Sequence, residues 1–401
     1  VGDDRNSIEP DDYSILIVDN DLGFSQFALE TARQTGFKAM VTPSGAAALA
    51  LAGQYQPRAI VLDISLPDID GWRVLERLKR DLSIRHIPVF VCSTVDNPEQ
   101  GLKLGAQGVL QKPIQTTEAL EQFLENVREY IDQTEKRITL VEPDDARREE
   151  LAELLTWPGV KVEAFANGAE AVKAYRRSGA DALVFTPEPG DMSLAVLAEQ
   201  IQSANSNWRP MLLYANHDLP QEQVQRFTRL AQEFNLEFVE TPAQLMDRAS
   251  AVLCEPLARL PEERREIIDQ LWDSTSILEG KKVLIVDDDI RNIFALTSVL
   301  ERYDMVTVSA ETGKDAINLL QAAPDVDIVL MDIMMPEMDG IDTTRAIRQI
   351  PRFKELPIVA VTAKAMVGDR EKCIEAGAWD YLSKPVDPDR MLSVLRAWLS
   401  K

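Results

Sequence analysis

The stretch from Ile328 to Gly340 constrains the fold more than any other part of the sequence. It begins with four apolar residues, meets a carboxylate at Asp332 and then enters a turn-forming segment that starts at Pro336. A short apolar run bounded by turn residues is typical of a strand buried on both faces of a parallel sheet. Asp332 would then lie at the carboxyl end of that strand, where open α/β sheets bind their ligands.

Three further predicted strands end in polar residues. Residues 283–286 lead into Asp287 and Asp288, residues 357–361 lead into Thr362, and residues 379–383 lead into Lys384. If these strands are parallel and adjacent, three carboxylates, a hydroxyl and an ammonium group meet in one pocket. Clustered carboxylates raise one another's pKa unless a cation lies among them, and hard oxygen ligands with waters left over suit Mg²⁺. The pattern therefore predicts a magnesium site.

The same pattern occurs earlier in the chain, in what we call copy one. Residues 15–18 lead into Asp19, residues 59–62 into Asp63, residues 88–92 into Ser93, and residues 108–111 into Lys112 and Pro113. Asp63 lies 44 residues after Asp19, as Asp332 lies 45 residues after Asp287. An internal repeat of this length indicates successive copies of one domain.

A middle copy, copy two, keeps the spacing and loses the chemistry. Thr186 stands where the other copies have Asp63 and Asp332, and it lies 44 residues after Glu142. Thr241 and Pro242 stand where the others have Lys and Pro. Because Thr186 offers no carboxylate and no Lys follows, we expect neither metal binding nor charge neutralisation in this copy.

The acid pair, Asp332, Thr362 and Lys384-Pro385 on successive strand ends together resemble the receiver domain of response regulators. The resemblance is specific and covers about 281–401. It implies an α/β architecture of three tandem doubly wound, flavodoxin-like (βα)5 domains, each with a five-stranded parallel sheet of order 2-1-3-4-5. We expect a leader at 1–12, receivers at 13–135 and 281–401, a pseudo-receiver at 136–256 and a helical linker at 257–280.

The resemblance also implies a role for each residue of the last copy. Asp332 accepts a phosphoryl group from a phosphohistidine, Asp288, Asp332 and the backbone carbonyl of Met334 ligate Mg²⁺, and Asp287 acts through a bound water. Lys384 pairs with the phosphoryl oxygens, Thr362 moves to hydrogen-bond one of them, and Tyr381 is the aromatic switch residue. A cis peptide bond is implied between Lys384 and Pro385.

Copy one differs from this pattern in one of the residues expected to bind the metal. The resemblance implies Asp19 and Asp63 as metal ligands and Asp63, Ser93 and Lys112 as the phosphoryl site, but Asn20 replaces the acid that would bind Mg²⁺ directly. Asp21 lies one residue further along and is expected to point elsewhere. We therefore predict weaker Mg²⁺ binding, and the sequence leaves open whether Asp63 is phosphorylated.

Two connectors stand out between the copies. Residues 116–136 read as a final helix that runs almost directly into the first strand of copy two. Residues 257–280 add one charged helix before the last copy, which we call copy three. We interpret this helix as a hinge or a lever.

Composition limits which partners the chain can bind and where in the cell it is expected. The formal charge of −23 argues against direct binding to nucleic acid or an anionic membrane. Three widely separated cysteines show no metal-ligand spacing, which favours a reduced, cytoplasmic location. No apolar stretch is long enough to span a membrane. The chain begins at Val1, so we expect a piece of a longer protein, whose membrane anchor, if any, lies outside these residues.

Three receivers without an output domain suggest the C-terminal part of a hybrid sensor histidine kinase. The chain has no nucleotide-binding glycine motif, so any kinase activity would belong to the parent protein. On this hypothesis copy three takes the phosphoryl group from the parent's histidine kinase domain and passes it to a histidine phosphotransfer protein, while copies one and two regulate.

A second hypothesis is a phosphorylation-switched interaction scaffold. Copy two would then serve as a protein-docking or second-messenger site. The arginine pairs 147–148, 176–177 and 264–265 could bind a phosphate-bearing ligand such as a cyclic dinucleotide. A metal-dependent phosphatase is excluded, because nothing beyond Asp332 supplies a general acid or base.

Overall fold

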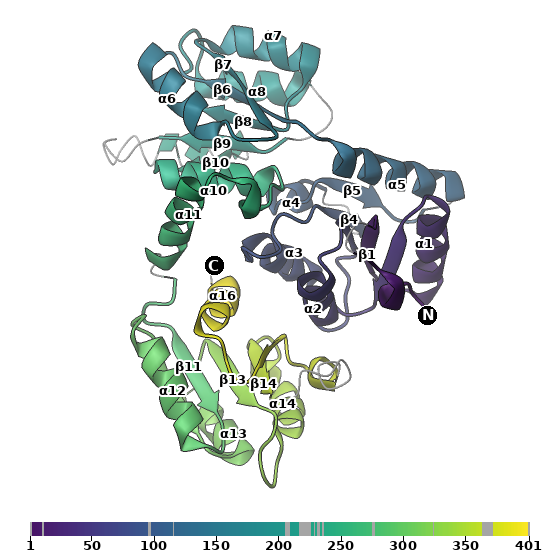
Figure 1. The fold of residues 1–401 in the computed structure, drawn as a ribbon, viewed down its shortest axis with the longest axis vertical. Coiled ribbons are helices and arrows are strands. Elements are labelled where there is room, and N and C mark those ends of the chain that lie inside the picture. The colour runs from purple at the N-terminus through teal and green to yellow at the C-terminus, as the bar shows by residue number, and fades with distance from the viewer. Residues whose placement is uncertain are drawn as a thin grey trace. The chain divides into compact units, whose positions relative to one another are not determined.

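The computed structural model contains three parallel five-stranded sheets, each with its own helices (Figure 1). It describes residues 2–9, 12–94, 98–114, 116–204, 209–215, 226–227, 229–230, 233–234, 236–274, 277–323, 325–362 and 372–399. All three sheets have the strand order 2-1-3-4-5 when the strands are counted within each domain, which confirms the predicted α/β fold.

The first domain has the sheet order β2-β1-β3-β4-β5. Its central strands β1, β3 and β4 are buried along their whole length, as the unbroken apolar runs predict. Its elements are η1 (Arg5–Ser7), β1 (Ser14–Val18), α1 (Leu22–Gln34), β2 (Lys38–Thr42), α2 (Gly45–Tyr55), β3 (Ala59–Leu62), α3 (Gly71–Arg80), β4 (Val89–Ser93), α4 (Pro98–Lys103), β5 (Gly108–Gln111) and α5 (Thr117–Asp132).

The second domain follows after a short connection, because α5 ends at Asp132 and the next strand begins at Lys136. Its sheet order is β7-β6-β8-β9-β10. Its elements are β6 (Lys136–Val141), α6 (Asp145–Leu155), β7 (Val160–Phe165), α7 (Gly168–Ser178), β8 (Ala182–Phe185), α8 (Leu194–Ala204), β9 (Met211–Tyr214), β10 (Leu236–Val239) and α10 (Pro242–Val252).

The charged linker forms η2 (Leu257–Arg259) and α11 (Glu262–Ser274), and α11 packs against the second domain. Ile268 on its inner face is fully buried. The Arg264 guanidinium donates hydrogen bonds to the carbonyl oxygens of Glu153 (2.8 Å) and Thr156 (2.7 Å) at the end of α6, and Trp272 Nε1 donates to Asp247 (2.9 Å). The linker helix therefore extends the core of the second domain.

The third domain has the sheet order β12-β11-β13-β14-β15. Its elements are β11 (Lys282–Val286), α12 (Ile290–Glu301), β12 (Val306–Ala310), α13 (Gly313–Ala322), β13 (Ile328–Asp332), α14 (Gly340–Arg348), η3 (Pro351–Phe353), β14 (Ile358–Thr362), β15 (Asp380–Ser383) and α16 (Pro388–Leu399). Strand pairing matches Val286 with Met331, Asp332 with Val361 and Thr362 with Ser383, so the polar strand ends lie side by side.

Two apolar clusters cover the two faces of this third sheet. Ile285 and Leu330 belong to one cluster, and Leu284 and Met331 belong to the other. On α12 the predicted stripe is buried at Ile293, Leu296 and Leu300, and burial of each such side chain contributes roughly 1.5–3 kcal/mol. Packing on both faces thus fixes the strand ends independently of the polar groups they present. Among the helices in the described residues, none is both long and apolar enough to cross a membrane.

Candidate functional site

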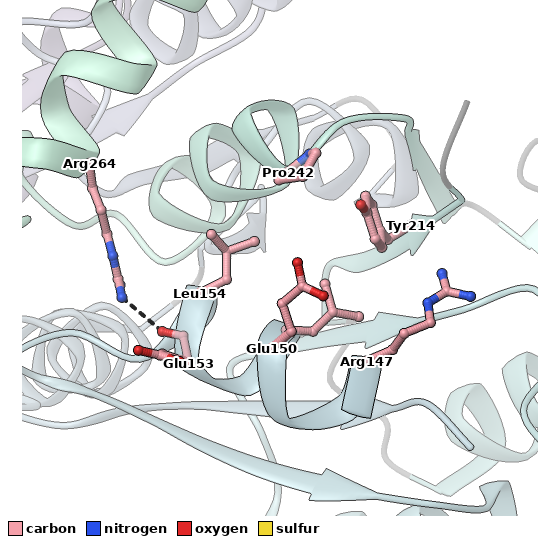
Figure 2. Close-up of a pocket in the computed structure, with 8 residues that line it drawn as sticks. Arg147, Glu150, Glu153, Leu154, Tyr214, Pro242 and Arg264 are labelled. Atoms are coloured by element: carbon pink, nitrogen blue, oxygen red, sulfur yellow. Dashed lines mark hydrogen bonds between the residues drawn. The ribbon is translucent and has the colours of Figure 1, made fainter. Parts of the chain in front are cut away.

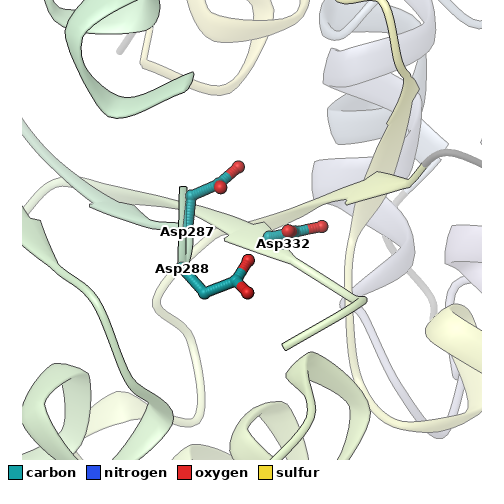
Figure 3. Close-up of side chains that lie close together, drawn as sticks. All are labelled: Asp287, Asp288 and Asp332. Carbon is teal, nitrogen blue, oxygen red and sulfur yellow. The ribbon is translucent and has the colours of Figure 1, made fainter. Parts of the chain in front are cut away.

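The carboxyl edge of the third sheet gathers the acids that the sequence predicts. Asp287 and Asp332 are 1% and 3% exposed, whereas Asp288 is exposed. Each of the three offers a carboxylate oxygen that lies within 4.8 Å of those offered by the other two (Figure 3). In the part of the chain that the structure describes, this is the one group of three acidic, histidine or cysteine side chains with that geometry.

Backbone and side-chain donors orient the two buried carboxylates. Asp287 accepts hydrogen bonds from the amide of Asp289 (2.9 Å) and from Asn292 Nδ2 (3.0 Å and 3.2 Å to its two oxygens). Asp332 Oδ1 accepts a hydrogen bond from the amide of Met334 (3.2 Å). The carboxylates are therefore held in place by the loops that follow β11 and β13 and by the first turn of α12.

Lys384 supplies the positive charge of the site. Its Nζ lies 2.7 Å from Asp287 Oδ2 and 2.9 Å from Asp332 Oδ2. Burial alone would lower the pKa of Lys384, but the hydrogen bonds to Asp287 and Asp332 outweigh it and hold that pKa above its ordinary value. One ammonium group among three carboxylates leaves negative charge uncompensated, so a divalent cation with oxygen ligands fits this donor set.

The loop after Asp332 approaches the site so closely that a glycine is required. A Cβ added at Gly340 would lie 2.1 Å from the carbonyl oxygen of Asp332. In the first domain, a Cβ at Gly71 would lie 2.7 Å from the carbonyl oxygen of Asp63. Leu194 occupies the equivalent position of the second domain, eight residues after Thr186. Because Leu194 carries a Cβ, an approach as close as that at Gly340 is not possible there without a shift of the backbone.

The remaining predicted residues of the third domain lie on the loop after β13 and on β14, β15 and the loop after β15. Thr362 is buried at the end of β14, and the peptide bond between Lys384 and Pro385 is cis, as expected. Tyr381 on β15 is half-buried, with the Arg390 guanidinium 5.8 Å from its ring centroid. The side chain of Met334 is 60% exposed, and its backbone adjoins Asp332.

Two features of this site were not predicted. Asn292, on the first turn of α12, orients Asp287, and its position five residues after that acid is the only sequence signal for it. Ile290, Phe294 and Met334 are large apolar side chains that are 66%, 74% and 60% exposed. Ile290 and Phe294 are four residues apart on α12 and so share one face, directly after the acid pair.

The first domain has the same two buried acids as the third domain, but the residue after the first acid is Asn20. Asp19, Asp63 and Ser93 are buried, Lys112 is half-buried, and the Lys112–Pro113 bond is cis. Asn20 is exposed. Asp21 caps α1, accepting hydrogen bonds from the amides of Gly23 (2.8 Å) and Phe24 (3.1 Å). As predicted, Asp21 therefore points elsewhere than the metal position.

The second domain uses the same positions for structural hydrogen bonds. Thr186 Oγ1 donates to the carbonyl oxygen of Val141 (3.1 Å), and Thr241 caps α10 in a reciprocal capping box with Gln244. Glu142 is buried and lies 3.7 Å from the Arg147 guanidinium. Among the described residues, Arg147 thus lies beside the buried Glu142 carboxylate, and Arg148 donates to the Glu142 carbonyl oxygen (3.0 Å).

The family model for the response regulator receiver domain matches residues 15–124 and 283–396, which together exceed half of the chain. The chain belongs to the response regulator receiver family. We therefore refer to the three domains as receivers 1, 2 and 3; receiver 2 has the same strand order. The family places the chain in two-component phosphorelay signalling.

Curated relatives of the chain are hybrid or sensor histidine kinases. It is 38% identical over 113 residues to the signal transduction histidine-protein kinase BarA of Shigella flexneri, a match that covers 28% of this chain and 12% of the relative. It is 35% identical over 129 residues to the sensor histidine kinase GacS of Pseudomonas protegens, covering 31% and 14%. The chain thus spans only a small part of these relatives.

Solved structures show similar receivers. The receiver domain of the sensor histidine kinase PA1611 from Pseudomonas aeruginosa, whose structure has a magnesium ion coordinated in the active site cleft, is 32% identical. That match covers 30% of this chain and 99% of the PA1611 chain, with a TM-score of 0.29. A response regulator from Chloroflexus aurantiacus is 30% identical, covering 31% and 100%, with a TM-score of 0.30.

Proposed function

We propose that receiver 3 accepts a phosphoryl group from a phosphohistidine onto Asp332, with Mg²⁺ bound, and passes it to a histidine phosphotransfer protein. Receivers 1 and 2 regulate this transfer. The observation that carries the proposal is the arrangement of Asp332 with two further carboxylates within 4.8 Å and the Lys384 ammonium 2.9 Å away.

Asp332 acts as the nucleophile. One of its carboxylate oxygens attacks the phosphorus in line as the N–P bond breaks, and the bond's electron pair stays on the imidazole nitrogen. The protonated phosphohistidine thereby leaves as neutral histidine, and Asp332 becomes an aspartyl phosphate. Because Met334 donates to Asp332 Oδ1, this contact orients the attacking carboxylate.

The neighbours of Asp332 neutralise charge as the phosphoryl group arrives. Asp288, Asp332 and the Met334 carbonyl would hold the Mg²⁺, Asp287 would act through a bound water, and the ion would supply positive charge for the phosphoryl oxygens. Lys384 moves from the carboxylates to a phosphoryl oxygen, Thr362 donates a hydrogen bond to another, and Tyr381 follows Thr362 as the switch. The magnesium in the related PA1611 receiver supports this assignment.

The apolar side chains beside the site suit a protein donor. Ile290, Phe294 and Met334 are exposed next to the acids, and exposed apolar patches mark interaction surfaces. A helical phosphotransfer protein or kinase domain that presents a histidine within an apolar face would cover them. The relatives support a histidine kinase as the parent protein, and we place the chain in the cytoplasm with it.

The test is transfer of label from a radiolabelled phosphohistidine donor to the whole chain. We expect Mg²⁺-dependent labelling that Asp332→Asn abolishes and Asp63→Asn leaves intact. Label that survives in Asp332→Asn and disappears in the double variant would make receiver 1 a second acceptor. A wild-type chain that takes up no label would overturn the proposal.

A scaffold function is the second candidate, and one observation favours it. Arg147, from one of the arginine pairs that we singled out, lines a cleft of receiver 2 with a half-exposed side chain, and Arg264, from another pair, closes one end of that cleft. Arg176 and Arg177 lie at the end of α7, outside that lining. A ligand in this cleft would act on a domain that has no phosphoacceptor of its own.

A further inference from the structure

Receiver 2 contains a cleft next to the position where its phosphoacceptor chemistry has been lost. The cleft lies between α6, the end of β9, the start of α10 and α11, and its volume is about 390 Å³ (Figure 2). Small-molecule sites in proteins usually occupy about 300–1,000 Å³, so the volume is sufficient for one nucleotide-sized group.

The apolar part of the lining offers flat surfaces. Tyr214 ends β9, Pro242 begins α10, and Leu154 comes from the last turn of α6. Tyr214 belongs to the buried core of receiver 2, which fixes the plane of its ring. A phenol ring, a proline ring and a leucine form a surface suited to the face of a planar heterocycle.

Two polar groups of the lining, the exposed Glu150 carboxylate and the Tyr214 hydroxyl, make no hydrogen bond or ion pair with the other described residues. Burial raises the pKa of Tyr214, so its hydroxyl stays protonated and can donate. Figure 2 shows Glu150 and Arg147 rising from α6 on the side that faces Tyr214 and Pro242.

Arg147 connects the cleft with the former acid site. Its guanidinium lies 3.7 Å from Glu142 Oε2, a buried oxygen that accepts no hydrogen bond. The Arg147 side chain is 50% exposed, so its remaining N–H groups face the cleft and solvent. A guanidinium with free donors binds a phosphate through two parallel hydrogen bonds.

We propose that this cleft binds a guanine nucleotide. Guanine presents two adjacent N–H donors on its pairing edge, which match the two oxygens of the Glu150 carboxylate. Adenine presents one donor and one acceptor there, and the acceptor would be repelled by the carboxylate. Tyr214 and Pro242 contact the face of the base, and Arg147 binds the phosphate.

The cleft is closed at one end by Arg264 of α11. Both terminal nitrogens of Arg264 donate to carbonyl oxygens of α6, so this residue forms a wall and takes no ligand contact. Because α11 precedes receiver 3 in the chain, a bound nucleotide stabilises the segment that joins receivers 2 and 3. The site deepens the regulatory role proposed for receiver 2 and does not depend on phosphotransfer at Asp332.

The experiment is calorimetric titration of the whole chain with GMP, GTP and cyclic di-GMP, and with AMP and cyclic di-AMP for comparison. We expect a guanine ligand to bind at least tenfold more tightly than its adenine counterpart. Comparing the linear and cyclic nucleotides distinguishes a metabolic nucleotide from a second messenger. Titration of Asp332→Asn should give the same affinities, so this test is separate from that of the relay.

Variants assign the contacts. Glu150→Gln should remove the preference for guanine over adenine. Arg147→Ala should lower the affinity for nucleotides at least tenfold and lower the affinity for guanosine, which has no phosphate, only a little. Tyr214→Phe should lower the affinity for all ligands modestly. Arg177→Ala, an exposed arginine on α7, is the matched control and should change nothing. Hydrogen exchange of α6 checks that each variant is folded. Absence of binding by all three guanine nucleotides, or binding unaffected by Glu150→Gln and Arg147→Ala, would overturn the proposal.

Discussion

Receivers 3 and 2 share a scaffold and differ in what they place at the ends of their strands. In both, a buried acid at the end of the first strand accepts a hydrogen bond from the amide two residues later, Asp287 from Asp289 and Glu142 from Asp144, each at 2.9 Å. Asp289 and Asp144 then cap the following helix. These contacts belong to the fold, since they persist where the phosphoacceptor is absent.

The residue five positions after that acid shows how the charge balance changed. In receiver 3 it is Asn292, a neutral side chain that donates to Asp287, while Lys384 supplies the charge. In receiver 2 it is Arg147, which lies beside Glu142 and supplies the charge itself. Receiver 2 thus lacks two of the acids and the lysine of receiver 3 and has an arginine beside the acid that it keeps, so no residue of either site can be interpreted alone.

The largest effect should come from restoring an acid to receiver 2. Thr186→Asp would bury a carboxylate beside Glu142, remove the hydrogen bond to Val141 and find no lysine at Thr241. We expect a loss of about 3 kcal/mol in the free energy of opening β8, because a buried charge without a partner is costly. Hydrogen exchange of β8 in the whole chain measures it.

Thr186→Val is the control for this change, since it removes only the hydrogen bond and should cost about 1 kcal/mol. Equal costs for the two variants would mean that Arg147 compensates the new charge. The difference between receivers 2 and 3 at this position would then affect function and not the stability of the domain.

A smaller effect is expected from Gly340→Ala. The added Cβ would approach the Asp332 carbonyl oxygen within 2.1 Å, so the loop must move, at a cost of about 2 kcal/mol, and phosphotransfer to Asp332 should fall. In Gly71→Ala the added Cβ would lie 2.5 Å from Ile64 Cα and 2.7 Å from the Asp63 carbonyl oxygen, so this change should cost less. Unfolding in urea and the rate of labelling measure both; a Gly340→Ala chain with wild-type labelling would contradict the proposed need for close backbone approach.

The smallest of these effects concerns Mg²⁺ affinity, and it compares receivers 1 and 3 directly. Asp288→Asn gives receiver 3 the residue that receiver 1 has at Asn20, and we expect about a tenfold loss in affinity, or about 1.4 kcal/mol. Asn20→Asp, made in that background, should restore a site of similar affinity in receiver 1. Calorimetric titration with Mg²⁺ measures both changes. If Asn20→Asp restores nothing, receiver 1 differs from receiver 3 by more than one ligand.

The sequence alone predicted the strand ends because position along a buried strand and register in a parallel sheet leave little freedom. Asp287, Asp332 and Thr362 follow apolar runs, and their pairing in the sheet brings them together. The chemical roles assigned to the site residues, the domain boundaries and the phosphorylation of Asp63 stay predictions.

Contacts made by helix faces were harder to predict. Asn292 looks like any polar residue of a first helical turn, and its function appears only when Asp287 is known to lie beneath it. The cleft of receiver 2 joins residues of α6 and α11 that are more than a hundred positions apart. The sequence of α11 suggests an exposed charged helix because the buried face of this helix is narrow, with Ile268 at its centre.

The docking of α11 has a practical consequence for dissecting the protein. A truncation after residue 256, where the repeat pattern ends, would remove the Arg264 side chain that donates hydrogen bonds to the last carbonyl groups of α6. It would also expose the surface that Ile268 covers. Such a fragment is expected to aggregate. Truncation after residue 274 keeps the helix with its domain, and that is where a soluble receiver 2 should be cut.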